Sequence, residues 1–179
     1  MITVDIGCGG KSRGYVNIDR YYADESPDTA QHIAPHLIKN FVLSDICNLP
    51  LRDDSVDVTV YHVIEHILEV NTAIKEIHRV CKNKAVIVVP NHPVVKEHYT
   101  HLYSWSKTSL QSYLSHYFPD VSVNIRTLKY FKQIHKIVSL IPVFFIRRRI
   151  YQTITAFIGF ELVAVCKKAS NLKEVKIIE

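Results

Sequence analysis

The sequence is poor in glycine and has no ordered pattern of cysteines. Of its 179 residues, five are glycine and four are cysteine. The cysteines form no CxxC pair and no ladder of short spacings, so they predict reduced thiols rather than a disulfide framework or a zinc ribbon. They are Cys8, Cys47, Cys81 and Cys166. The first residues also lack the basic start, apolar stretch and cleavage site of a secretory signal. We therefore expect a cytoplasmic protein.

Long hydrophobic runs are absent too. The most apolar block, residues 130–158, is cut by Arg147, Arg148 and Arg149 well short of the ~20 residues that a membrane span needs. We expect no membrane span and interpret the block as a helical insertion before the last strand, broken near Pro142 and covering the sheet. A homodimer face and a lid over an apolar substrate stay open as alternatives.

The charge balance is mild. The sequence has 22 basic and 17 acidic side chains, which gives a net charge of +5. Such an excess would help to attract an anionic substrate or a nucleic acid, but alone it indicates neither. The hydrophobic fraction of 47% is typical of globular proteins and excludes a disordered chain. With no repeat, low-complexity tract or linker, residues 1–179 are expected to form a single domain.

Short β-branched runs alternate with helix-like stretches, which predicts an open, mostly parallel α/β sheet. The expected strands are Ile2–Ile6, Tyr15–Asp19, Asn40–Ser44, Val56–Tyr61, Lys84–Val89, Val121–Arg126 and Phe160–Lys167. The expected helices are Thr72–Cys81, Ser106–Tyr117 and Ser26–Lys39. The first has one apolar face, and the second starts at a serine suited to capping. Pro35 is expected to end or kink the third.

Four of the five glycines fall between residues 7 and 14, directly after the first expected strand. A phosphate loop is one interpretation, because Gly10-Lys11-Ser12 matches the end of GxxxxGK[ST]. However, Asp5 stands where that motif needs its first glycine, and a strand follows instead of a helix. A second interpretation is the dinucleotide-binding fingerprint GxGxxG. However, Ser12 occupies the position of its third glycine, and the acidic residue that should follow, Asp19, comes too early.

The run Asp5-Ile6-Gly7-Cys8-Gly9-Gly10 instead resembles the first motif of class I methyltransferases that use S-adenosylmethionine (SAM). A loop of exposed N–H groups beside an acid suits the ammonium, carboxylate and sulfonium groups of SAM. The resemblance implies that Asp5, Gly7, Cys8 and Gly9 lie beside the methionine part of SAM. It also implies that Asp19 accepts the two ribose hydroxyls, and that Asp45 and Ile46, with His62, complete the cofactor site.

Later segments resemble further motifs of the same family in the expected order. They are residues 49–58, Tyr61–His66, His78–Lys82 and Val88–Asn91. The chain thus resembles a short member of the methyltransferase type 11 group. The resemblance implies a Rossmann-like seven-stranded sheet of order 3-2-1-4-5-7-6, flanked by helices. Two features depart from the family pattern. The link from Gly7 to Gly14 is too short for a crossover helix, and Lys82-Asn83-Lys84 replaces a glycine turn, with Asn83 expected in the left-handed conformation.

Two metal motifs overlap this pattern. His62-Val63-Ile64-Glu65-His66 fits the H-x-x-E-H of zinc peptidases. Some methyltransferases that act on hydroxyl groups use E-x-x-E-H, but His62 replaces the first glutamate here. We therefore expect no metal. For His66, two interpretations have equal weight: it is a hydrogen-bonded spacer in the wall of the site, or it takes part in the reaction. Tyr103 and Trp105 are interpreted as packing residues first and as a substrate platform second.

Methyl transfer from a sulfonium is an in-line displacement that mainly requires positioning of the acceptor. A base that titrates near neutrality would help a hydroxyl or amine acceptor, and His62 or His92 is the candidate. The acceptor is not identifiable from the sequence, although a small molecule is slightly favoured. Two alternatives stay open, namely a SAM-binding interaction module without catalysis and a nucleic-acid methyltransferase.

Overall fold

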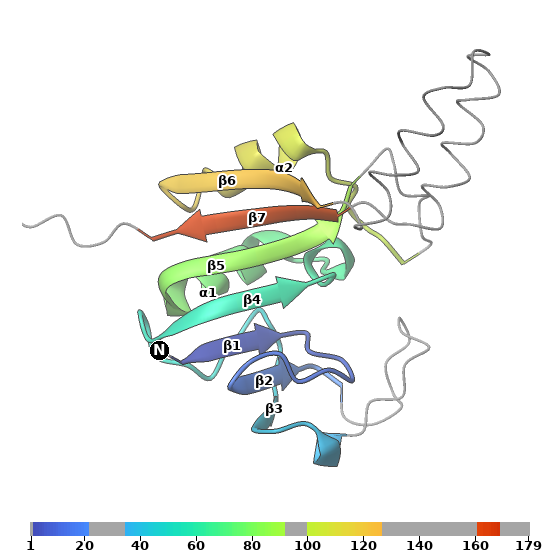
Figure 1. The fold of residues 1–179 in the computed structure, drawn as a ribbon, viewed down its shortest axis with the longest axis vertical. Coiled ribbons are helices and arrows are strands. Elements are labelled where there is room, and N and C mark those ends of the chain that lie inside the picture. The colour runs from blue at the N-terminus through green and yellow to red at the C-terminus, as the bar shows by residue number, and fades with distance from the viewer. Residues whose placement is uncertain (1, 22–34, 92–99, 127–160, 169–179) are drawn as a thin grey trace, which may run out of the picture.

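The computed structural model describes residues 2–21, 35–91, 100–126 and 161–168. Seven strands form one sheet in the order β3-β2-β1-β4-β5-β7-β6 (Figure 1), as predicted. The strands are β1 Thr3–Ile6, β2 Val16–Asp19, β3 Phe41–Leu43, β4 Val56–Tyr61, β5 Cys81–Pro90, β6 Asp120–Arg126 and β7 Glu161–Lys167. The helices are α1 Val70–Val80 and α2 Lys107–Leu114, with short 3-10 turns η2 Pro35–Leu37 and η3 Ile64–His66.

The direction of the strands decides which residues meet at the functional edge. Strands β1 to β5 pair in parallel, whereas β7 runs antiparallel to both β5 and β6. The carboxyl ends of β1 to β5 therefore lie at the same edge as the start of β7, where Pro90 pairs with Glu161. This places Glu161 beside His62, which precedes it by 99 positions.

The link between β1 and β2 contains no helix, which confirms the prediction of a short connection. The side chain of Asn17, which is fully buried, ties the link down. Its amide accepts a hydrogen bond from the Gly14 N–H and donates to Ser12 Oγ and to the carbonyl oxygens of Gly14 and Lys39. One buried amide thus satisfies backbone groups that a crossover helix would satisfy internally.

Both described α-helices lie behind the sheet in Figure 1, and their apolar faces form one core with it. In α1 the buried stripe repeats at helical spacing: Val70, Ala73, Ile74, Ile77 and Val80. Helix α2 buries Leu110 and Leu114 and begins at Ser106, whose hydroxyl accepts a hydrogen bond from the Ser109 N–H. The predicted apolar face of the first helix and the serine cap of the second are therefore confirmed.

The boundary between α1 and β5 differs from the prediction. The strand begins at Cys81 instead of Lys84, and Asn83 lies within the strand instead of in a left-handed turn. The reason is the buried carboxylate of Asp57, which accepts hydrogen bonds from the Asn83 and Lys84 N–H groups at 3.3 Å each. A partner 26 residues earlier thus holds a polar, turn-like segment in the sheet.

Other boundaries also need correction. Helix α2 ends at Leu114, three residues before the predicted end at Tyr117, because the chain continues as a turn there. Of the predicted helix Ser26–Lys39, the described part contains only the 3-10 turn Pro35–Leu37, as a proline that kinks the chain would suggest. The predicted insertion at 130–158 lies outside the described residues. In the part of the chain that the structure describes, no helix combines the length and the apolarity needed to cross a membrane.

Candidate functional site

The glycine loop after β1 adopts a conformation that side chains would oppose. Gly7 has φ +70° and Gly9 has φ +53°. A Cβ on Gly7 would lie 2.2 Å from Val63 Cγ2, whereas a Cβ on Gly9 would meet nothing within 4 Å. Gly7 is thus required by close packing and by its backbone angle, and Gly9 by its backbone angle alone. The space over Gly9 is open to a ligand.

Asp19 ends β2 and fastens this loop. It is 8% exposed. Its Oδ2 accepts a hydrogen bond from the Gly9 N–H at 2.8 Å, and its Oδ1 accepts one from the Tyr21 N–H at 3.1 Å. Each carboxylate oxygen can accept a second hydrogen bond. Asp19 is therefore oriented by the backbone and can still bind a pair of hydroxyl groups.

A cavity of about 810 Å³, part of it open to solvent, lies at the carboxyl edge of the strands. Such an edge is where open α/β sheets bind ligands. Its lining includes six of the predicted cofactor residues, namely Gly7, Gly9, Asp19, Asp45, Ile46 and His62. His66 lies in the wall too, as its interpretation as a spacer expects. The lining also includes residues that the sequence analysis did not select, among them Arg20, Tyr21, Val63 and Ile67. Because Arg20 and Tyr21 directly follow Asp19 in the sequence, their place in the wall of the cavity could have been predicted.

Asp5 and Cys8 lie off the cavity wall. The buried Asp5 carboxylate accepts a hydrogen bond from Thr59 Oγ1 at 3.4 Å and pairs with Arg13 at 3.5 Å. Burial raises the pKa of Asp5, and Arg13 opposes that rise. Burial and the nearby Asp19 raise the pKa of the Cys8 thiol to about 12, so Cys8 is protonated at neutral pH. Direct contacts of Asp5 and Cys8 with a cofactor stay predictions. In the structure, Asp5 pairs with Arg13 in the link between β1 and β2.

His62 lines the cavity in a left-handed conformation, with φ +53°. Its Nε2 donates to Glu161 Oε1 at 2.9 Å, and its Nδ1 lies 3.3 Å from Glu65 Oε1. Burial alone would lower the pKa of His62, but the two carboxylates outweigh it and raise the pKa above its usual value. The ring is consequently more often protonated at neutral pH than an ordinary histidine. His92, the other predicted base, lies outside the described residues.

Glu161 connects His62 to a second cation. Arg126 Nε donates to Glu161 Oε2 at 2.7 Å. Burial raises the pKa of Glu161, but His62 and Arg126 together outweigh burial and lower it. The guanidinium groups of Arg126 and Arg13 lie 5.8 and 4.7 Å from the ring centre of Tyr61. His62 directly after β4, Arg126 in β6 and Glu161 in β7 therefore form one charged network at the edge of the cavity.

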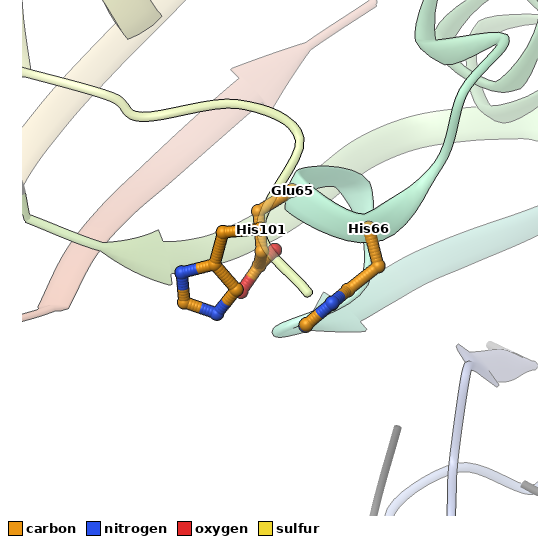
Figure 2. Close-up of side chains that lie close together, drawn as sticks. All are labelled: Glu65, His66 and His101. Atoms are coloured by element: carbon orange, nitrogen blue, oxygen red, sulfur yellow. The ribbon is translucent and has the colours of Figure 1, made fainter. Parts of the chain in front are cut away.

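Glu65, His66 and His101 form a second cluster beside the cavity (Figure 2). One ligand atom from each side chain lies within 4.8 Å of the others. Glu65 is fully buried, and neither carboxylate oxygen receives a hydrogen bond from the described residues. His66 Nδ1 lies 3.2 Å from the Thr100 carbonyl oxygen, so His66 is hydrogen-bonded, as its interpretation as a spacer expects. The sequence predicted no metal, and nothing here tests that prediction.

Tyr103 and Trp105 are packing residues. Trp105 is 8% exposed and lies between the rings of Tyr103 and Tyr113, at centroid distances of 5.9 and 5.1 Å. The Tyr103 hydroxyl donates to the Leu68 carbonyl oxygen. The first interpretation of the pair is therefore confirmed.

Comparison with known proteins finds one family model and several solved structures that resemble this chain. Residues 4–89 match the family model described as a methyltransferase domain. Among solved structures, a SAM-dependent methyltransferase from Thermotoga maritima matches with a TM-score of 0.62 and 15% identity, over 94% of this chain and 82% of that one. A SAM-dependent methyltransferase from Archaeoglobus fulgidus matches with a TM-score of 0.60 and 17% identity, over 93% and 85%. A search of curated proteins found no significant match.

A third solved structure contains an activator protein. The chain bound to the Trm112 methyltransferase activator of Haloferax volcanii matches with a TM-score of 0.59 and 16% identity, over 96% of this chain and 83% of that one. At these identities the likeness of the structures shows a shared fold.

Proposed function

We propose that this chain is a class I SAM-dependent methyltransferase, which binds SAM in the cavity at the sheet edge and transfers its methyl group to an acceptor. The observation that carries the proposal is the geometry of Asp19. Its carboxylate ends β2, is oriented by the Gly9 and Tyr21 N–H groups, and faces the same cavity as Asp45.

Each part of SAM has a counterpart in the cavity wall. Asp19 would accept both ribose hydroxyls, because a carboxylate can accept two hydrogen bonds at once from a vicinal diol. Asp45 and Ile46 would bind the adenine ring, and Asp45 is held for this role because its Oδ1 accepts a hydrogen bond from the Cys47 N–H at 2.8 Å. The open space over Gly9 would take the methionine part of SAM.

The chemistry is an in-line displacement at the methyl carbon, and the acceptor must be held near attack distance on the S–CH₃ axis. Bound SAM supplies the activated methyl group. We propose His62 as the residue that contacts the acceptor, because it lines the cavity. Its Nε2 is bonded to Glu161, so the contact with the acceptor would use Nδ1, which makes no aligned hydrogen bond to Glu65. The raised pKa of His62 means that the ring acts as a base only at higher pH. His92 stays a second candidate base.

Calorimetry with SAM and S-adenosylhomocysteine tests the cofactor. We expect 1:1 binding to the wild type and a 10- to 100-fold weaker affinity, roughly, for Asp19→Ala, since hydrogen bonds to a charged group contribute about 1.5–3 kcal/mol. Asp120→Ala is the matched control, because Asp120 is exposed and pairs with Lys167 away from the cavity. Equal affinity of Asp19→Ala and wild type for both ligands would overturn the proposal.

Transfer of a labelled methyl group tests catalysis. The protein is incubated with methyl-labelled SAM and with separated small-molecule, protein and nucleic-acid fractions of a cell extract. We expect label in the small-molecule fraction. Label that disappears on nuclease treatment would instead establish a nucleic-acid acceptor. SAM binding without transfer to any fraction would indicate a SAM-binding module and overturn the enzymatic part of the proposal.

A further inference from the structure

We propose that Glu65, His66 and His101 form a binding site for a divalent transition-metal ion of the zinc type, at the wall of the proposed SAM cavity. The three side chains come from two segments that are 35 residues apart and converge on one point (Figure 2). The metal site itself does not depend on SAM binding, and only the role that we assign to the metal rests on the proposed function.

The first observation is the carboxylate of Glu65. Glu65 is fully buried, and neither of its carboxylate oxygens receives a hydrogen bond within the described residues. Buried carboxylates are normally hydrogen-bonded or paired, because desolvation of an unpartnered charge is very unfavourable. The nearest cation, His62, has its Nδ1 at 3.3 Å without hydrogen-bond alignment, and it is shared with Glu161. A bound cation would compensate the buried charge of Glu65.

The second observation is the tautomer of His66. A carbonyl oxygen can only accept a hydrogen bond, so the 3.2 Å contact with Thr100 requires that Nδ1 of His66 carries the proton. In the neutral ring, Nε2 then carries the lone pair. Histidines that bind metals usually donate their other ring N–H to a carbonyl or carboxylate, which fixes the ring and the tautomer in this way.

The third observation is how His101 is held. The Leu102 and Tyr103 N–H groups both donate to the carbonyl oxygen of Glu65, at 2.8 and 3.2 Å. These bonds fasten the segment that carries His101 to the residue that carries the carboxylate. The rings of His66 and His101 meet edge to face with centroids 4.8 Å apart. Ligand atoms around a tetrahedral zinc ion are about 3.4 Å apart, so small side-chain rotations would close the site.

The donor set selects the kind of metal. Two imidazoles and one carboxylate are the ligands of many catalytic zinc sites, and they also suit Fe²⁺, Co²⁺ and Mn²⁺. Three protein ligands leave at least one coordination position open. Because His66 lines the cavity, that position is available to an oxygen atom of the methyl acceptor.

This location indicates a hydroxyl group as the acceptor. A hydroxyl oxygen bound to the metal has a lowered pKa and loses its proton to solvent water near neutral pH. Its electron pair then forms the new bond to the methyl carbon, while the methyl–sulfur bond breaks and its electron pair returns to sulfur. The products are a methyl ether and S-adenosylhomocysteine.

The test uses tag-free, chelator-treated full-length protein and the metals Zn²⁺ and Co²⁺ as probes. We expect one equivalent of Zn²⁺ to bind in calorimetry, and Co²⁺ to give the visible absorption bands of a four- or five-coordinate ion. Glu65→Gln and His101→Ala should each weaken Zn²⁺ binding by more than about tenfold. His116→Ala is the matched control, because His116 is an exposed histidine beyond α2 whose ring hydrogen-bonds to the carbonyl oxygens of Ser112 and Tyr113.

Two further measurements keep the proposal falsifiable if a variant folds poorly. On the wild type, NMR should show Zn²⁺ shifting the ring signals of His66 and His101 and leaving those of His116 in place. Asp19→Ala should lose SAM affinity and keep Zn²⁺ affinity, so that the two proposals can fail separately. Absence of stoichiometric Zn²⁺ binding, or binding that shifts neither His66 nor His101, would overturn the metal site.

Discussion

The structure constrains the identity of Gly7 in two ways. Gly7→Ala combines a left-handed backbone with a methyl group 2.2 Å from Val63 Cγ2. We expect the free energy of unfolding to fall by about 2–4 kcal/mol, from left-handed strain and from overpacking. Urea denaturation measures this loss.

Gly9→Ala is the matched comparison, because it shares the positive φ but meets no atom within 4 Å. It should cost only about 1–2 kcal/mol. Adding Val63→Ala to Gly7→Ala should recover part of the loss, since the clashing Cγ2 atom is gone. Equal losses for Gly7→Ala and Gly9→Ala would show that the contact with Val63 does not matter.

The titration of His62 provides a second prediction for a single residue. Burial lowers its pKa, but Glu65 and Glu161 raise it above the usual 6.5. A raised pKa in the folded state means that the protonated ring stabilises the fold below pH 6.5 or so, and that this contribution is lost as the pH rises through the raised value. NMR titration of the His62 ring in metal-free protein should show a midpoint above 6.5.

Glu161→Gln removes one of the two carboxylates and should move that midpoint down. Asp120→Asn, which changes an acid that pairs with Lys167 on the surface, should leave it in place. A wild-type midpoint at or below the usual value would contradict the geometry of the cluster.

Sequence reasoning located residues whose position depends on local chain order. Gly7, Gly9 and Asp19 stand at strand ends in a motif, so their meeting at one edge follows from parallel strands. The contact of His62 with Glu161 spans 99 positions. It depends on an antiparallel β7 that brings Glu161 beside Pro90, and no local pattern encodes that pairing.

At the scale of elements, Arg79 joins α1 to the loop that precedes β4. Its guanidinium donates to the carbonyl oxygens of Leu51 and Leu49 at 2.8 and 3.0 Å, and to Glu76 at 2.7 Å. Arg79→Lys cannot reproduce this fork. We expect a loss of about 1–3 kcal/mol in the free energy of unfolding, measured by urea denaturation. Arg52→Lys, an exposed arginine in the same loop, should cost less than about 0.5 kcal/mol. Similar losses for the two variants would refute the role of Arg79.

Element boundaries were predicted less well than element types, and β5 shows why. Among its first residues, Lys82, Asn83 and Lys84 are consecutive polar residues and resemble a turn. Tertiary hydrogen bonds from Asn83 and Lys84 to the buried Asp57 override that local preference. In contrast, the apolar stripe of α1 is itself the cause of its packing, so the sequence pattern located that helix to within two residues.

At the scale of the whole molecule, a ligand that binds only the folded state must raise the melting temperature. SAM at about 100 times its Kd adds about 2.7 kcal/mol to the stability. For a chain of 179 residues, this corresponds to a rise of roughly 5–10 °C. Asp19→Ala should lose most of this shift, and Asp120→Ala should keep it. Because Asp19 and the Glu65–His66–His101 cluster use separate side chains, the shifts with SAM and with Zn²⁺ should add in the wild type. A Zn²⁺ shift that vanishes in Asp19→Ala would show that the two sites are not independent.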